Sequence, residues 1–128
     1  MRERGGSSPS WGTNKSLIKM HKARSRSITF NIYIAGDYSK AVESTKQYCD
    51  QKGMCVTVTP TKYVYTGGEE DGVIVGIINY PRFPKYFHEL FATAEEIAEK
   101  LCIDLGQQSY SIDTPKETHW YSNRPEDN

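Results

Sequence analysis

The sequence predicts an α+β fold: a small antiparallel or mixed sheet with two helices on one face, in the order β-α-β-β-α-β-β. Three observations predict it. Apolar and polar residues alternate from Ile28 onward, which is typical of a half-buried strand, and apolar residues recur at helical spacing in two later stretches. Two pairs of β-rich segments are each interrupted by turn residues. Strands grouped in this way, with only two helices, favour a sheet that is covered on one face.

The first predicted strand leads directly into the first predicted helix. Its polar face carries Thr29, Asn31 and Tyr33, and its apolar positions are Ile28, Phe30, Ile32 and Ile34. Asp37 then occupies a favoured N-cap position, and Gly53 is a favoured residue for a helix end. We therefore expect a helix over roughly 38–52.

Two β-rich segments follow, Cys55–Tyr65 and Gly72–Tyr80, and predict a hairpin with a loop from Thr66 to Gly72. The Gly67-Gly68 pair in this loop is not a phosphate-binding loop, because no Lys-Ser or Lys-Thr pair follows it. Three acidic residues directly after the pair would also repel a phosphate.

The second predicted helix keeps its apolar spacing from Phe87 to Leu105 and should end at Gly106. Thr93 and Glu96 have the spacing of a capping box. The rest of the chain predicts a second hairpin. Its two strands and its turn are Ser109–Asp113, Glu117–Ser122 and Thr114-Pro115-Lys116.

The sheet face without helices is expected to be rich in aromatic rings. Depending on register, its rings are Tyr33, Tyr63 or Tyr65, and Trp120 or Tyr121. An open aromatic face favours self-association, so we expect a homo-oligomer.

Charge divides the chain into two parts, although the formal net charge of the whole is zero. Residues 1–26 carry seven Lys or Arg against Glu3, about +6, which leaves about −6 on the remainder. The first part has few aliphatic residues, which predicts a basic disordered N-terminal arm over 1–26. Residues 27–125 are predicted to form a single ligand-binding domain. The arm is either simply solvated or binds RNA or an anionic membrane.

The chain is expected to be soluble and to stay inside a cell, because it has neither an apolar signal segment nor a membrane-spanning stretch. Its three cysteines, Cys49, Cys55 and Cys102, lack the paired spacing of a zinc site, so we expect reduced thiols and no metal. A disulfide between Cys49 and Cys55 would be unusual in a reducing compartment.

The sequence offers no set of catalytic residues. His88 and His119 lie in no recognised motif, and His88 begins an HExxA run that lacks the second histidine of a zincin. Glu95, Glu96 and Glu99 are expected mostly on the solvent side of the second helix. These observations predict that the chain is not an enzyme and needs no cofactor.

The run from Ile78 to Pro84 is the strongest candidate for a ligand site. Two prolines restrict the backbone around Arg82 and Phe83, so both side chains would lose little entropy on binding. A guanidinium beside an aromatic ring suits a phosphate and a base. The alternative is a structural corner in which Tyr80 and Phe83 belong to the core and Arg82 is solvated.

Five motifs, taken in order, resemble the first Thoeris anti-defence family of phage proteins. They are Ile32-Tyr33-Ile34-Ala35-Gly36-Asp37, Tyr48-Cys49-Asp50 with Gly53 to Val58, Tyr63 to Glu69, Ile78-Asn79-Tyr80-Pro81-Arg82-Phe83-Pro84, and Ser122-Asn123-Arg124. The resemblance implies a sponge in the host cytoplasm that binds and sequesters a cyclic ADP-ribose isomer without cleaving it. It also implies a dimer or a hexamer, with cyclic trinucleotides held at separate sites in some members.

For a cyclic ADP-ribose isomer, Arg82 and Arg124 are suited to the two phosphates, Phe83 or Tyr80 to the adenine, and Asn79 or Asn123 to base or ribose edges. Tight binding by a small subunit would need a pocket shared between copies. Two other classes remain open: a small cyclic-nucleotide phosphodiesterase, and an RNA-binding or protein-binding regulator that uses the basic arm. With the sponge, we expect neither a membrane nor a nucleic acid polymer as a partner.

Overall fold

A computed structural model of the chain describes residues 19–127. Its elements are β1 (Thr29–Ala35), α3 (Tyr38–Lys52), β2 (Thr57–Tyr65), β3 (Gly68–Ile78), α4 (Phe87–Asp104), β4 (Ser109–Asp113), β5 (Thr118–Ser122) and the short 3-10 helix η2 (Pro125–Asp127). The predicted α+β class and the β-α-β-β-α-β-β order are confirmed, with η2 added at the end. Most of the predicted basic arm lies outside the described residues, and its boundary stays a prediction.

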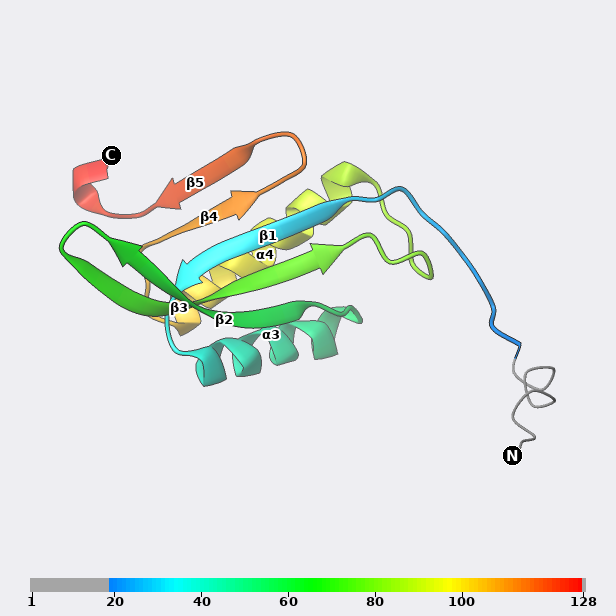
Figure 1. The fold of residues 1–128 in the computed structure, drawn as a ribbon, viewed down its shortest axis with the longest axis horizontal. Helices are drawn as coiled ribbons and strands as arrows, with labels where there is room; N and C mark the ends of the chain where they lie inside the picture. Colours follow the sequence, from blue (N-terminus) through cyan, green and yellow to red (C-terminus); the bar gives the residue numbers. More distant parts are fainter. Residues whose placement is uncertain (1–18, 128) are drawn as a thin grey trace, which may run out of the picture.

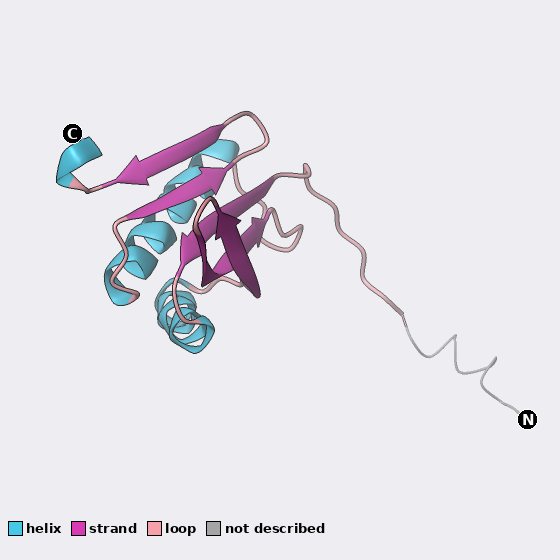
Figure 2. Ribbon diagram, turned by 60° about the vertical axis from the view of Figure 1, so that its left-hand side comes forward, coloured by secondary structure: helices cyan, strands magenta, loops and turns pink. Residues whose placement is uncertain are grey.

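The five strands form one sheet in the order β2-β3-β1-β4-β5, and every neighbouring pair is antiparallel. Figure 1 shows α3 and α4 on the same side of this sheet, and the turned view in Figure 2 shows the other side without helices. The expected placement of both helices on one face is therefore confirmed.

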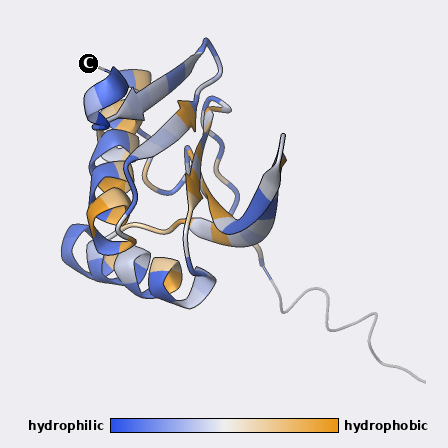
Figure 3. Cartoon of the chain, turned by 90° about the vertical axis from the view of Figure 1, so that its left-hand side faces the viewer, coloured by the Kyte–Doolittle hydropathy of each residue, from blue (hydrophilic) through white to orange (hydrophobic). Residues whose placement is uncertain are grey.

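The core lies between the sheet and the two helices, where apolar parts of α4 and of the central strands face one another (Figure 3). Alternate residues of β1 and β3 point into it because side chains alternate across a strand. The largest fully buried side chains are Phe30, Ile32, Ile34, Val73, Val75, Ile77, Ile97, Leu101 and Ile112. Phe30 packs against the first turns of α4, with its ring centroid 5.2 Å from that of Phe87 and 6.0 Å from that of Phe91.

The ends of α3 agree with the sequence prediction. Asp37 Oδ2 accepts a hydrogen bond from the Lys40 N–H at 3.0 Å. The helix ends at Gly53, which has the left-handed conformation with φ 67°. The predicted capping box of Thr93 and Glu96 is wrong, because α4 begins at Phe87 and contains both residues. Glu89 caps the helix instead, since its Oε1 accepts from the Tyr86 N–H at 2.9 Å.

The β2–β3 hairpin is tighter than predicted. The predicted loop from Thr66 to Gly72 is wrong, because β3 begins at Gly68 and only a two-residue turn remains. The acidic residues at the start of β3 pair with Lys62, Tyr63 and Val64 of β2. Lys62 Nζ lies 3.3 Å from Glu69 and 3.0 Å from Asp71. Gly67, at φ 87°, supplies the conformation that so short a turn needs.

The register places Tyr33, Tyr63 and Tyr65 on the open face of the sheet, as predicted. Trp120 joins them opposite Ser111, whereas Tyr121 turns to the helix side and donates a hydrogen bond to Glu95 Oε2 at 2.7 Å. In the described part of the chain, no helix is long and apolar enough to cross a membrane.

Candidate functional site

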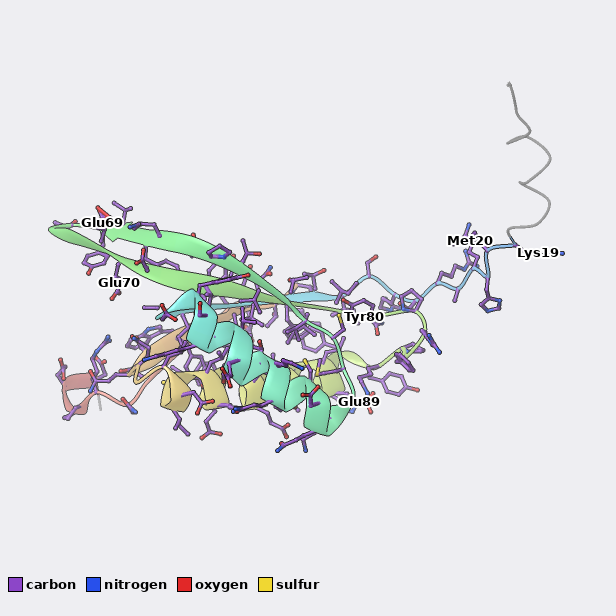
Figure 4. All side chains as sticks on the ribbon, turned by 90° about the horizontal axis from the view of Figure 1, so that it is seen from below. Lys19, Met20, Glu69, Glu70, Tyr80 and Glu89 are labelled. Atoms are coloured by element: carbon purple, nitrogen blue, oxygen red, sulfur yellow. The ribbon has the colours of Figure 1, made fainter. Side chains whose placement is uncertain are left out.

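The run between β3 and α4 forms a compact corner, called here the proline corner (residues 79–86). The Phe83 N–H donates to the Tyr80 carbonyl at 2.9 Å, which closes a turn over Pro81 and Arg82. Figure 4 shows Tyr80 at the end of the sheet from which the N-terminal segment leaves, far from the hairpin tip that carries Glu69 and Glu70.

Asn79 holds the corner in place. Its side-chain Nδ2 donates to the Arg26 carbonyl at 2.9 Å, and its Oδ1 accepts from the Lys85 N–H at 2.8 Å. Its own carbonyl accepts from Ser25 Oγ at 2.7 Å. Asn79 is only 7% exposed, and its hydrogen bonds connect the proline corner to the segment before β1. The structure thus supports a positioning role for this predicted ligand residue.

We expect Asn79→Ala to lower the free energy of unfolding by about 1–3 kcal/mol, because the Arg26 carbonyl and the Lys85 N–H, both in part-buried hydrogen bonds, would lose their partner. Urea denaturation measures this loss. Asn123→Ala is the matched control: its side chain is exposed, and the substitution should cost less than about 0.5 kcal/mol. Equal losses in the two variants would contradict the role assigned to Asn79.

One side of the proline corner borders a cavity of about 680 Å³, called here the corner cavity. Its walls come from the end of α3, the α3–β2 loop, the end of β3, the corner and α4. Three predicted site residues, Tyr80, Arg82 and Phe83, line it together. Phe83 is 61% exposed, and the Arg82 guanidinium lies 5.4 Å from its ring centroid. The alternative in which Phe83 belongs to the core is therefore wrong.

A tyrosine and a glutamate from different helices meet in the cavity wall. The Tyr48 hydroxyl of α3 donates to Glu96 Oε1 of α4 at 2.6 Å. Burial, and then the hydrogen bond to Glu96, raises the pKa of Tyr48. Tyr48 therefore remains a hydrogen-bond donor at neutral pH and fixes the position of the Glu96 carboxylate.

The charges around the corner cavity are mixed. Asp50 and Glu96 supply negative charge, and Lys52, Arg82 and Lys85 supply positive charge. Apolar surface between them comes from Met54, Ile78 and Leu90. Such a cavity can bind an aromatic ligand that carries both signs of charge.

Cys49 and Cys55 lie beside the cavity and form no disulfide in this structure. The Tyr80 hydroxyl donates to Cys55 Sγ at 3.3 Å. Burial, and then the nearby Cys55, raises the pKa of the Cys49 thiol, so this thiol is a poor nucleophile at neutral pH. Among residues 19–127, no three His, Cys, Asp or Glu side chains are arranged to hold a metal ion.

Asn123 and Arg124 lie at the opposite end of the sheet. Ser122 pairs with Ser109 at the end of the β4–β5 hairpin away from Asp113, and Asp113 pairs with Asn31 near the start of β1. In Figure 1 the chain after β5 is accordingly far from the corner. Arg124 Nη1 lies 3.9 Å from Asp127 Oδ2. Within one subunit, the predicted site residues thus form two separate groups.

Two residues of the cavity were missed by the sequence prediction. Glu96 was expected mostly on the solvent side of its helix, where it is indeed exposed, but its place in the cavity wall was not predicted. Tyr48 was named in a motif of the resemblance without a role in binding. The two are 48 positions apart and meet only because α3 and α4 pack side by side. The neighbouring Glu95 bonds Tyr121 on another side of α4, so the adjacent glutamates have different surroundings.

The predicted histidines do not line the corner cavity. The His88 ring stacks on Tyr86, with 5.8 Å between centroids and 7° between planes. The His119 ring lies 5.0 Å from that of Phe91, and its Nε2 is 3.2 Å from Glu117. Neither ring contributes to the cavity wall.

An antiparallel sheet covered on one face, with a cavity of about 680 Å³ at one end, defines a small α+β domain suited to binding a small molecule. No family model and no curated protein matches the sequence. Among solved structures, a phage SAM lyase in complex with S-methyl-5′-thioadenosine shares the fold. Its TM-score is 0.68 at 13% identity, over 82% of this chain and 96% of the lyase. A phage SAM lyase in the apo state matches with a TM-score of 0.61 at 13% identity, over 76% of this chain and 90% of the lyase.

These structures correct the prediction that the chain is not an enzyme. The sequence predicted a binding protein without catalysis. The same fold, however, occurs in a lyase. It is a fold known from phage proteins, in agreement with the broader part of the predicted resemblance. The lack of a histidine motif does not exclude an enzyme, because lyase chemistry does not always require a histidine.

Proposed function

We propose that the corner cavity binds S-adenosylmethionine and that the protein depletes it by breaking a carbon–sulfur bond. The observation that carries this proposal is the Tyr48–Glu96 pair, a hydrogen-bonded carboxylate in the wall of a cavity that also offers aromatic and cationic side chains. The fold shared with a lyase whose structure holds S-methyl-5′-thioadenosine supports the same class of ligand.

The cavity residues match the parts of this substrate. Glu96 attracts the positively charged sulfonium, and the exposed ring of Phe83 offers a stacking surface for the adenine. Arg82 lies beside that ring and suits the substrate carboxylate through charge-assisted hydrogen bonds. An uncharged thioether product would lose the attraction to Glu96, which favours its release.

The proposed reaction needs little from the protein beyond positioning. The substrate carboxylate attacks its own γ carbon, a carbon–oxygen bond forms, and the carbon–sulfur bond breaks with its electron pair going to sulfur. The products are S-methyl-5′-thioadenosine and a lactone that keeps the ammonium group. Because the sulfonium leaves as a neutral thioether, no proton donor is required, and holding the carboxylate in line with the C–S bond is the main task.

A second ligand class is favoured by the three cations of the cavity, Lys52, Arg82 and Lys85. They suit the two phosphates of a cyclic ADP-ribose isomer, which the protein would remove from host defence signalling. Phe83 is largely exposed at the cavity wall, so a second copy of the chain would enclose such a ligand better. This proposal includes a homo-oligomer in the host cytoplasm.

One experiment separates the two ligand classes. The full chain is incubated in parallel with S-adenosylmethionine, S-methyl-5′-thioadenosine and a cyclic ADP-ribose isomer, and both retained and free molecules are identified by mass spectrometry. Conversion of S-adenosylmethionine to the thioether supports the lyase proposal. Retention of the cyclic isomer with no change in S-adenosylmethionine supports sequestration. No retention and no conversion would reject the corner cavity as the site for either class.

We expect Arg82→Ala to weaken binding of S-adenosylmethionine by about 1.5–3 kcal/mol, through loss of a charge-assisted hydrogen bond. Isothermal titration calorimetry measures the change. Arg124→Ala tests the second predicted cation at the far end of the sheet. A similar loss there would show that a second copy completes the cavity, whereas unchanged affinity would confine the site to the corner. Unchanged affinity in Arg82→Ala would reject the assignment of Arg82 to the substrate carboxylate.

A further inference from the structure

A second cavity of about 650 Å³ lies on the other side of the proline corner and plays no part in the proposed function. It is called here the N-terminal groove. Its walls come from the segment before β1, the end of the corner, the first residue of α4 and the β4–β5 turn. Arg26, Lys85 and Lys116 line it, and none of its lining residues is acidic.

The cations of the groove are not neutralised by neighbours. In the described part of the chain, no carboxylate lies within ion-pair distance of Arg26, Lys85 or Lys116. Lys116 is instead held over the Phe87 ring, with Nζ 4.4 Å from its centroid. The groove therefore keeps a positive potential that is available to an anion.

The positive charge continues along the chain that leads into the groove. Lys22, Arg24 and Arg26 occupy alternate positions of a segment that belongs to no helix or strand, and no acidic residue occurs between 19 and 36. All three are exposed. Successive cations on such a segment can contact successive phosphates of one strand without a preformed surface.

An aromatic side chain borders the same groove. Tyr86 lines it and remains 73% exposed even though His88 stacks on its ring. An exposed ring beside unpaired cations is the combination that single-stranded nucleic acid uses, since bases stack on rings while phosphates contact Lys and Arg. A lipid surface could contact the basic segment, but it would not use the concavity of the groove.

We propose that the N-terminal groove, together with residues 19–26, binds single-stranded nucleic acid. Lys22, Arg24 and Arg26 contact consecutive phosphates, and Tyr86 stacks on a base held in the groove. The N-terminal groove shares only Lys85 with the lining of the corner cavity, and the variants used below leave Lys85 unchanged.

The test measures binding of fluorescein-labelled U10 and dT10 to the full chain by anisotropy over a range of salt concentrations. The variant Lys22→Gln/Arg24→Gln/Arg26→Gln should weaken binding about 10- to 100-fold at low salt and reduce the salt slope by about 2. Its matched control is Lys40→Gln/Lys46→Gln/Lys62→Gln, which removes the same charge from α3 and β2 and should bind nearly as the parent does. Equal losses in the two triple variants would overturn the proposal.

Stacking is tested separately. Tyr86→Ala should weaken U10 binding about 5- to 100-fold with an unchanged salt slope, whereas Tyr38→Ala, another exposed tyrosine at a helix start, should not. Thermal denaturation checks that both variants fold. ADP binding as tightly as U10 would overturn the proposal of a strand in favour of a single nucleotide. Binding to phosphatidylserine vesicles with no binding of U10 or dT10 would overturn it in favour of a membrane.

Discussion

Replacing Phe30 with alanine is expected to lower the free energy of unfolding by about 3–5 kcal/mol. Phe30 has no exposed surface, and its ring packs against those of Phe87 and Phe91 in the first turns of α4. Alanine would leave a cavity where β1 meets this helix. Because small domains have total stabilities of about 5–15 kcal/mol, the loss would bring the protein close to unfolding.

Chemical denaturation followed by circular dichroism measures this effect, and Phe83→Ala is the matched control. The same side chain is removed there from an exposed position in the proline corner, so its stability cost should stay within about 0.5 kcal/mol. Its ligand affinity should fall by about 1–3 kcal/mol if the ring stacks on adenine. A large stability loss in Phe83→Ala with a small one in Phe30→Ala would contradict the assigned core.

The fold was predictable wherever local signals and burial agree. In β1 the alternation of Phe30, Ile32 and Ile34 matched the buried face, and Asp37 with Gly53 marked the ends of α3. The β2–β3 hairpin was predicted, but its loop was predicted too long, because β3 begins with acidic residues that have low strand propensity. Two of those acids, Glu69 and Asp71, lie within ion-pair distance of Lys62 on the neighbouring strand, a cross-strand contact that composition alone does not reveal.

The candidate site was predictable only in its corner. Pro81 and Pro84 restrict the local backbone, so Arg82 and Phe83 were identified from adjacent residues in the sequence. Glu96 was not, because its role depends on contact with Tyr48 across two helices. The separation of Arg82 from Arg124 likewise follows from the strand order of the sheet. Motifs in a sequence do not show at which end of a sheet their residues lie.

Glu96→Gln is expected to weaken binding of S-adenosylmethionine by about 1.5–3 kcal/mol, roughly 10- to 100-fold. The charge of the carboxylate is lost, while the amide can still accept a hydrogen bond from Tyr48. S-methyl-5′-thioadenosine has an uncharged sulfur, so its affinity should change less than about threefold. The substitution thus tests the contact with the sulfonium separately from the contacts with the adenosine.

The adjacent residue provides the control. Glu95 accepts a hydrogen bond from Tyr121 at 2.7 Å, much as Glu96 accepts one from Tyr48, but it does not line the corner cavity. Glu95→Gln removes the same charge one position away and should leave both affinities unchanged, as measured by calorimetry. Equal weakening of the two ligands in Glu96→Gln would show that the carboxylate does not contact the sulfonium. If Glu95→Gln weakened binding of S-adenosylmethionine as much as Glu96→Gln does, Glu96 would act only through the general negative charge of α4.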